Sequence, residues 1–234
     1  MRYSNRTSLI LSTPGTMGQS SCSLESIMAG HCAGAHGCIL PVDTTQDDIT
    51  ILCESGSYQI AGETLSVHDN SFETLRAAYP KIVSFGQALE LVRSYSGKLG
   101  IELHQPLTAA QVRISLKYSE YLENAYLCGL QPQQAAALAA QYPDLQVMVD
   151  LPLSPEDPVT FVRGAQRLGL FGLRAAPELL SETLCAEALR CGLFLASTET
   201  DDPEILHSLV ARGVNFIETS RPDLALSGQP VQQA

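Results

Sequence analysis

Short apolar runs alternate with longer segments of helical periodicity along most of this chain of 234 residues. Such alternation is typical of βα units, in which helices join neighbouring parallel strands of one sheet. Runs with the composition of strands cover residues 8–11, 37–42, 49–53, 99–103, 125–128, 147–151, 171–174, 193–197 and 215–219. A single (β/α)8 barrel commonly has about this chain length but needs eight strands, so one run is in excess.

The excess run is explained by the short connection between residues 42 and 49. A parallel crossover requires about a dozen residues or more, so the segment 43–48 is too short for one. We therefore expect the second and third runs to form an antiparallel hairpin that places Ile39 opposite Cys53. The expected fold class is an α/β barrel of eight parallel strands with this hairpin added.

Helix signals recur between the later strands as an N-cap residue, a periodic segment and a closing glycine. The cap and the glycine are, in turn, Ser154 and Gly169, Ser181 and Gly192, and Asp202 and Gly213. Helices are also expected over residues 84–95 and 133–141. The polar and weakly periodic segment 56–79 is expected to be a loop.

The balance of charge bears on the class of partner. Asp and Glu outnumber Lys and Arg by 25 to 14, which gives a formal net charge of -11. The basic residues are scattered singly along the sequence, so the negative field is not overridden by a basic cluster. We therefore expect no binding to nucleic acid.

Cysteine spacing and hydropathy bear on the cellular compartment. The seven cysteines form no C-x-x-C pair, and several lie in apolar runs, where a free thiol behaves as a small hydrophobic group. The N-terminal apolar run covers only residues 9–11, and no stretch approaches the roughly 20 apolar residues of a membrane-spanning helix. We expect a cytoplasmic protein with reduced cysteines and no transmembrane segment.

The stretch from Gly213 to Pro222, G-V-N-F-I-E-T-S-R-P, resembles the closing strand of glycerophosphodiester phosphodiesterases, G-V-D-x-I-x-T-D-R-P. The strand I-E-L-H at residues 101–104 resembles the I-E-L-K strand of that family. The similarity runs in order over nearly the whole chain, strong in the last third and eroded in the first. It implies one TIM barrel of this type over residues 1–228, a frayed tail over 229–234, and a connection with lipid metabolism.

The resemblance also indicates which catalytic groups this sequence lacks. Enzymes of the family hold a calcium or magnesium ion between carboxylates and use two histidines to move protons. The histidine positions fall at Thr13 and Cys53, and two carboxylate positions fall at Ile39 and Pro41. Glu102 is the metal ligand that remains. Hard divalent cations need oxygen ligands, which the side chains of Ile39 and Pro41 cannot supply.

These losses predict a pseudoenzyme, a catalytically inactive homologue of a phosphoric diester hydrolase that needs no cofactor. It would act by binding a small anionic ligand or a protein partner, and a homo-oligomer is compatible with this role. The alternative is a weak or rewired phosphodiesterase acting on glycerophosphodiesters, with calcium or magnesium held by the relocated carboxylates of Asp43, Glu54 and Glu102. A third interpretation is a subunit whose barrel is purely structural.

Two further sets of side chains are candidates for chemistry or binding. Cys53 is a candidate nucleophile if His104 acts as its base, although a buried structural thiol is commoner. Arg174, Thr198 and Asp150 lie at strand ends, where ligands of barrels bind, so they are candidates for contact with an anionic ligand. An ion pair is the competing interpretation of Arg174.

Overall fold

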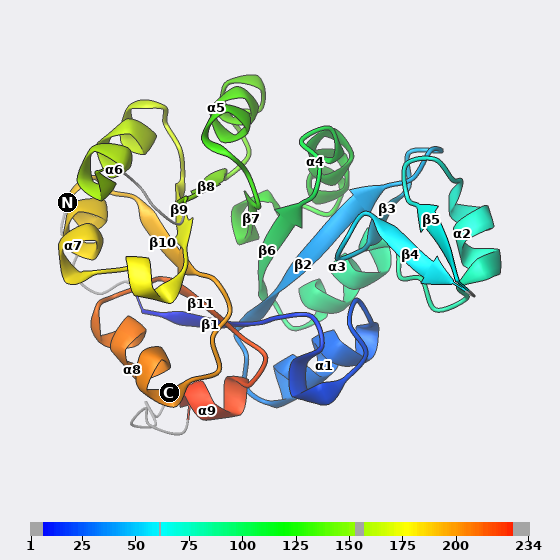
Figure 1. Ribbon diagram of the computed structural model, residues 1–234, viewed down its shortest axis with the longest axis horizontal. Helices are drawn as coiled ribbons and strands as arrows, with labels where there is room; N and C mark the ends of the chain where they lie inside the picture. Colours follow the sequence, from blue (N-terminus) through cyan, green and yellow to red (C-terminus); the bar gives the residue numbers. More distant parts are fainter. Residues whose placement is uncertain (1–6, 61, 153–156, 227–234) are drawn as a thin grey trace.

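A nearly closed barrel of parallel strands forms the centre of the computed structural model, which describes residues 7–60, 62–152 and 157–226 (Figure 1). Within these residues the barrel has eight strands: β1 (Leu9–Ser12), β2 (Gly37–Thr44), β6 (Lys98–Leu103), β7 (Ala125–Cys128), β8 (Met148–Asp150), β9 (Gly172–Ala175), β10 (Phe194–Ser197) and β11 (Phe216–Thr219). Their hydrogen-bonded order is β7-β6-β2-β1-β11-β10-β9-β8, and a bridge between Leu127 and Val147 joins the two ends. The α/β barrel predicted from the sequence is confirmed, and each predicted strand lies within two residues of its observed bounds.

The predicted hairpin is also present, because β3 (Thr50–Leu52) pairs antiparallel with β2. Its register differs from the expectation by two residues. Val42 is opposite Leu52, and the Cys53 N–H donates to the Pro41 carbonyl at 3.0 Å, so Cys53 faces Pro41 rather than Ile39. The turn sets this register, since the hydroxyl of Thr45 accepts from the Ile49 N–H at 3.0 Å and closes a tighter loop than the sequence pattern indicated.

The prediction of a loop over residues 56–79 is wrong. This segment contains the antiparallel strands β4 (Ser57–Ile60) and β5 (Glu63–Ser66), followed by helix α2 (Phe72–Ala78). The insertion lies beyond β3, at the opposite side of the molecule from α6 and α7 (Figure 1). It has a small core of its own, formed with Ile51, Cys53, Val67, Leu75 and Ile82. The strand pattern is weak because both strands are half-buried or exposed on every residue.

The barrel is surrounded by helices, several of which begin at a capping side chain. They are α1 (Leu24–Cys32), α3 (Phe85–Ser94), α4 (Thr108–Tyr118), α5 (Pro132–Gln141), α6 (Pro158–Arg167), α7 (Glu182–Arg190), α8 (Pro203–Ala211) and α9 (Pro222–Leu226), with 3-10 turns at Thr16–Gly18, Leu122–Asn124 and Pro177–Leu179. The side chains of Ser181 and Asp202 cap α7 and α8 as predicted. Asp157 caps α6, whereas the expected cap at Ser154 and the tail after residue 228 lie outside the described residues.

The interior of the barrel is apolar at the N-terminal end of its strands. Rings of Tyr126, Phe171, Phe194 and Phe216 stack there, with centroids of Phe171 and Phe194 only 4.3 Å apart. Gly100 leaves room for Tyr126, since a Cβ at that position would lie 2.8 Å from the tyrosine hydroxyl. This end of the barrel is therefore a packed core, and the opposite end, where the strands finish, is the one available for chemistry.

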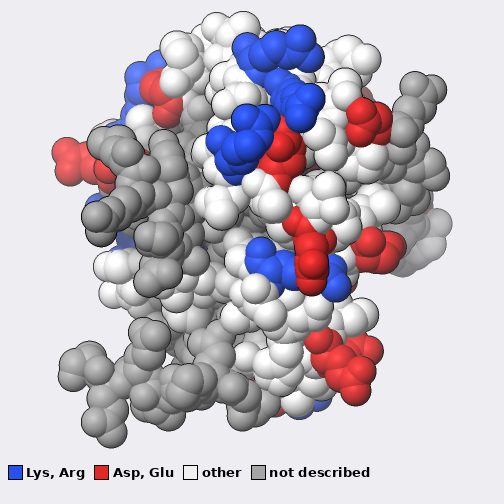
Figure 2. Space-filling view, turned by 90° about the vertical axis from the view of Figure 1, so that its left-hand side faces the viewer, with Lys and Arg blue, Asp and Glu red and all other residues white. Residues whose placement is uncertain are grey.

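The outer surface over α6 and α7 carries charges of both signs. Figure 2 shows basic and acidic side chains lying next to one another on this face. Among them Arg163 and Arg190 both bind Glu187, at 2.7 Å and 2.6 Å. Interleaved charges produce a weaker local field than a patch of one sign. In the described part of the chain, no helix combines the length and the hydropathy needed to cross a membrane.

Candidate site at the barrel mouth

Four charged side chains meet at the carboxyl end of the barrel. Glu102, Asp150, Arg174 and Glu218 come from β6, β8, β9 and β11, respectively. Glu218 lies two residues after the inward-facing Phe216, and Asp150 lies two residues after the inward-facing Met148. Because side chains alternate along a strand, these positions point to the same side as the interior layer but one step closer to the mouth. They form the charged cluster of the barrel mouth.

Arg174 is the centre of this charged cluster. Its Nε and Nη2 donate to the two carboxylate oxygens of Glu218, each at 2.8 Å, in a bidentate pair. Its Nη1 lies 3.2 Å from Asp150 and 3.4 Å from Glu102, and its Nη2 is also 3.4 Å from Glu102. All three guanidinium nitrogens are therefore engaged by carboxylates from three other strands.

Burial differs sharply among the members of the cluster. The side chains of Glu218 and Arg174 are 1% and 9% exposed, whereas those of Asp150 and Glu102 are 31% and 34% exposed. Burial raises the pKa of Glu218 to about 7, although Arg174 opposes the rise. Burial also raises the pKa of Asp150, against the effect of Arg174 and of the Gly129 N–H that Asp150 accepts at 3.1 Å. Three carboxyl groups share one guanidinium, so the half-exposed outer pair carries unbalanced negative charge.

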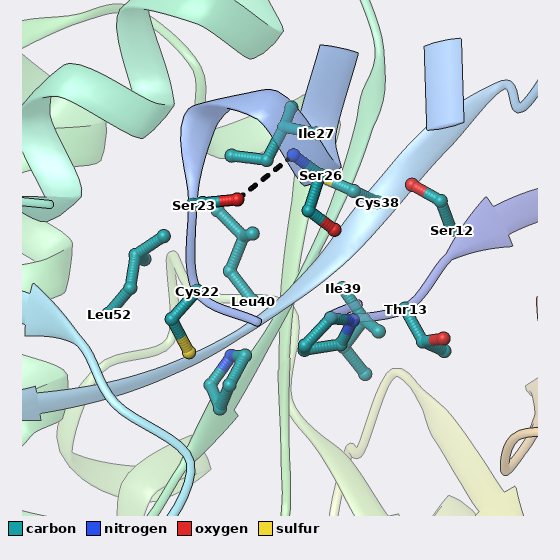
Figure 3. A pocket seen from close by; sticks show the side chains of 12 residues that line it. Ser12, Thr13, Cys22, Ser23, Ser26, Ile27, Cys38, Ile39, Leu40 and Leu52 are labelled. Carbon is teal, nitrogen blue, oxygen red and sulfur yellow. Dashed lines mark hydrogen bonds between the residues drawn. The ribbon is translucent and has the colours of Figure 1, made fainter. Parts of the chain in front are cut away.

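A small pocket between β1, β2, β3 and α1 is lined by Thr13, Ile39 and Pro41. These residues stand where the resemblance implies one histidine and two carboxylates. Figure 3 shows Thr13 and Ile39 there, together with Cys22 and Ser23, whose hydroxyl accepts from the Ser26 N–H. The space between the side chains is about 10 Å³, close to the smallest cavity that holds one water molecule. The hydroxyl of Thr13 is buried without a hydrogen-bond partner among the described residues. This corner of the mouth is filled rather than open to a substrate.

Cys53 and His104, the candidate catalytic pair, lie next to each other but not as a nucleophile and its base. The Nε2 atom of His104 is 2.7 Å from the backbone carbonyl of Cys53, to which a ring N–H donates. The thiol instead lies 3.8 Å from the carbonyl of Ser57. Burial raises the pKa of Cys53, which disfavours the reactive thiolate. The geometry provides no contact from the imidazole to the sulfur, and a catalytic role for the pair stays a prediction.

Asp43 and Glu54, which were predicted as relocated metal ligands, lie in different surroundings. Asp43 is fully buried, and its Oδ1 is 2.8 Å from the Thr44 N–H and 3.0 Å from Nε2 of His68. Glu54 is exposed at the end of the hairpin. Among the described residues, no group of three or more His, Cys, Asp or Glu side chains is arranged to hold a metal ion. The Asp43–His68 pair was missed because His68 follows β5, in the segment expected to be a loop.

The residues at the mouth do not fit the calcium or magnesium ion that the family resemblance implies. Ile39 and Pro41 present only carbon, and Glu102 faces the guanidinium of Arg174. A hard cation prefers several charged oxygens directed at one point that no other cation occupies. Glu102, the ligand of this set that remains, is instead paired with Arg174 at 3.4 Å.

The candidate anion-binding set of Arg174, Asp150 and Thr198 is only partly brought together. Arg174 and Asp150 are in contact, while Thr198 is half-buried and its N–H pairs with the carbonyl of Ala175 at 2.8 Å. Arg174 is an ion-paired residue, as one interpretation held, but in a buried cluster rather than on the surface. Glu218 was not predicted as a site residue, although an acid on the face of Phe216 in the closing strand is a recognisable signal.

Solved structures with this fold include several glycerophosphodiester phosphodiesterases. The enzyme from Thermotoga maritima matches with a TM-score of 0.81 at 17% identity, covering 96% of this chain and 100% of that one. The enzyme from Agrobacterium tumefaciens str. C58 matches with a TM-score of 0.78 at 15% identity, covering 94% and 99%. A phosphodiesterase from Oleispira antarctica, in complex with the product sn-glycerol-3-phosphate, matches with a TM-score of 0.78 at 14% identity, covering 94% and 96%.

No protein-family model matches the sequence, and no curated protein matches it. At identities of 14–17% the structural likeness establishes the fold. The chain therefore has the barrel of the glycerophosphodiester phosphodiesterases.

Proposed function

We propose that this chain is a glycerophosphodiester phosphodiesterase-like protein that has lost phosphodiesterase activity and acts by binding a ligand or a protein partner. One observation carries the proposal. The guanidinium of Arg174 stands beside Glu102, the metal ligand that the resemblance retains, and contacts Asp150 and Glu218 as well. A protein cation in that place leaves the mouth without the open carboxylate oxygens on which metal-assisted hydrolysis depends.

The missing proton-transfer groups support the same proposal. Each positioned acid or base typically contributes about 10²- to 10⁴-fold to the rate, so losing two lowers it by about 10⁴- to 10⁸-fold. Thr13 is a buried hydroxyl, and Cys53 is a thiol with a raised pKa whose neighbouring imidazole contacts a carbonyl. Neither group can replace a histidine that must gain and release a proton near neutral pH.

The charge of the mouth bears on what it binds. Every guanidinium nitrogen of Arg174 is already within 3.4 Å of a carboxylate oxygen, which leaves few donors for an anion. The half-exposed carboxyl groups of Glu102 and Asp150 would also repel one. We therefore favour a protein partner over a small anionic ligand. The seven free cysteines support a cytoplasmic location for this interaction.

Hydrolysis of a glycerophosphodiester tests the proposal. Release of glycerol phosphate is measured for the wild type and for Glu102→Gln, with calcium or magnesium added, after both proteins are shown to melt cooperatively. We expect both to stay at the background rate. Metal-dependent release by the wild type that Glu102→Gln abolishes would contradict the loss of activity.

A rewired phosphodiesterase is a second candidate, favoured by the contact between His68 and Asp43. Nε2 of His68 lies 3.0 Å from the buried carboxylate of Asp43 without a hydrogen bond among the described residues, and the His68 side chain is 31% exposed. A carboxylate next to an imidazole recurs in catalytic triads. If residual hydrolysis is found, His68→Ala should remove it. The control is His31→Ala, since His31 is an exposed residue of α1 that stacks on Tyr95 at 4.1 Å.

A further inference from the structure

We infer that Arg174 is the resident cation of the barrel mouth, occupying the space between Glu102, Asp150 and Glu218 and excluding a divalent cation from it. The inference deepens the proposed function and rests on it, because it gives the physical reason why the mouth takes no catalytic metal. It assigns a group of the chain itself, the guanidinium of Arg174, as the counter-charge of these three carboxyl groups.

The strand register directs the guanidinium to this point. Arg174 is aligned with Asp150 on one neighbouring strand and with Ala196 on the other. Ala196 is a fully buried member of the interior cluster, and its small side chain lets Arg174 cross in front of β10 to reach Glu218 on β11. A larger inward-facing residue at that position would block the bidentate contact. Ala196 therefore acts as a positioning residue for the resident cation.

The shape of the guanidinium suits three carboxyl groups at once. Its planar fork binds both oxygens of Glu218 on one edge, and its remaining N–H groups face Asp150 and Glu102. A lysine ammonium at the same position would be a point charge and could not satisfy both sides. The neighbour on the remaining side, Cys128, is fully buried, and burial raises its pKa, so it stays a neutral thiol. Arg174 therefore supplies the positive charge that all three acids contact.

Exclusion of a divalent cation follows from the charges and distances. An ion bound by Glu102 and Asp150 would lie close to a guanidinium that is already within 3.4 Å of both. The repulsion between the two cations would act at the edge of a buried, poorly screened region. To relieve it, Arg174 would have to leave Glu218, which would then be a buried carboxylate without a partner.

The test is removal of the resident cation, with the metal ion alone as the probe. Arg174→Ala leaves the three carboxyl groups in place, and its melting temperature is measured with and without calcium or magnesium. We expect a rise of about 5–10 °C when the free ion reaches about 100 times its Kd. Guanidinium ion, below denaturing concentrations, should stabilise the same variant by re-occupying the space. The control is Arg163→Ala, which removes an exposed arginine paired with Glu187 and should show no response.

The wild type is titrated in parallel by calorimetry, with Glu102→Gln for comparison, so that the result does not depend on a destabilised variant. We expect no heat of binding from the mouth in the wild type. Calcium or magnesium binding that Glu102→Gln abolishes would overturn the inference, and so would a folded Arg174→Ala variant that gains no response to any of these cations. A variant that refolds from denaturant only when the cation is present supports it.

The outcomes also separate this inference from the proposed function. Binding of metal by the wild type at Glu102 without hydrolysis would overturn the resident-cation assignment and leave the loss of activity standing. Hydrolysis that persists in Glu102→Gln, with no metal bound at the mouth, would overturn the proposed function alone.

Discussion

Lys98 and Arg174 lie at the two ends of the barrel in opposite surroundings. At the N-terminal end, Nζ of Lys98 lies 5.9 Å and 5.8 Å from the ring centroids of Phe171 and Phe216, and it donates to the neutral carbonyl of Glu123 at 3.0 Å. At the carboxyl end, Arg174 is held by three carboxyl groups. Burial lowers the pKa of Lys98 to about 8, while its partners raise that of Arg174.

The difference shows which cation the fold depends on. Lys98 can be replaced without leaving a buried charge behind, because aromatic rings and neutral acceptors tolerate a neutral neighbour. Arg174 cannot be removed in that way, because Glu218 is almost fully buried and loses its counter-charge. Lys98 contributes contacts to the packing of the apolar layer. Arg174 compensates the buried charge of Glu218, so the fold depends more strongly on it.

The largest expected effect is on stability at the carboxyl end. At pH 8, above the raised pKa of Glu218, Arg174→Met should lower the free energy of unfolding by about 3–5 kcal/mol, because it leaves the Glu218 carboxylate unpaired. Lys98→Met should lower it by about 1 kcal/mol or less, because a cation–π contact and neutral hydrogen bonds are lost. Denaturant unfolding of both variants measures the two values. Equal losses of unfolding free energy in the two variants would contradict this difference between the two ends.

A second prediction concerns pH. The pKa of Glu218 is raised in the folded state, so between its unfolded value and about 7 the folded protein holds a proton that the unfolded chain has released. Stability contributed by this group should therefore fall by roughly 2 kcal/mol as pH rises from about 5 to 7. The difference between wild type and Glu218→Gln, followed by unfolding at several pH values, should show that slope. A difference in stability between the two proteins that does not change with pH would contradict the raised pKa of Glu218.

Lys98 should show the opposite sign in an alkaline window. Its folded pKa is lowered to about 8, so above that pH the folded protein has released a proton that the unfolded chain still holds. Stability from this group should rise with pH from about 8 towards the ordinary lysine value. Comparison of wild type with Lys98→Met isolates the slope, and a decline over this range would be inconsistent with a buried ammonium.

The smallest expected effect is a gain in stability in the apolar layer at the N-terminal end. The hydroxyl of Tyr126 is buried with no hydrogen-bond partner in the described part of the chain. Tyr126→Phe removes this unsatisfied group and keeps the ring stacked on Phe216, so stability should rise by about 1 kcal/mol. Thermal unfolding measures it. A loss of stability would show that the hydroxyl has a partner after all.

The sequence was sufficient for features that depend on local pattern. Strands such as β7 and helices capped by Ser181 and Asp202 were placed from apolar runs and capping residues alone. The β4–β5 hairpin was not predicted, because every residue of its two strands is half-buried or exposed and the apolar pattern is weak. The shift of Cys53 to a position opposite Pro41 depended on turn geometry that periodicity does not encode.

The candidate site was only partly predictable. Glu102, Asp150 and Arg174 were recognisable as charged residues at strand ends, but their meeting at one point depends on the register of several strands and on the small size of Ala196. Glu218 is 44 residues from Arg174 in sequence, so their bidentate contact has no local signature. The same holds for Asp43 and His68, which are joined only by the folding of the insertion.

The side chain of Arg174 can be observed directly by ¹⁵N–¹H spectroscopy of arginine Nε groups, with Arg174→Lys to identify its signal. If Arg174 is the resident cation, its Nε–H bond to Glu218 should give one slowly exchanging signal that calcium and magnesium leave unchanged. A signal that exchanges as fast as those of exposed arginines, or that moves as either ion is titrated, would contradict the account.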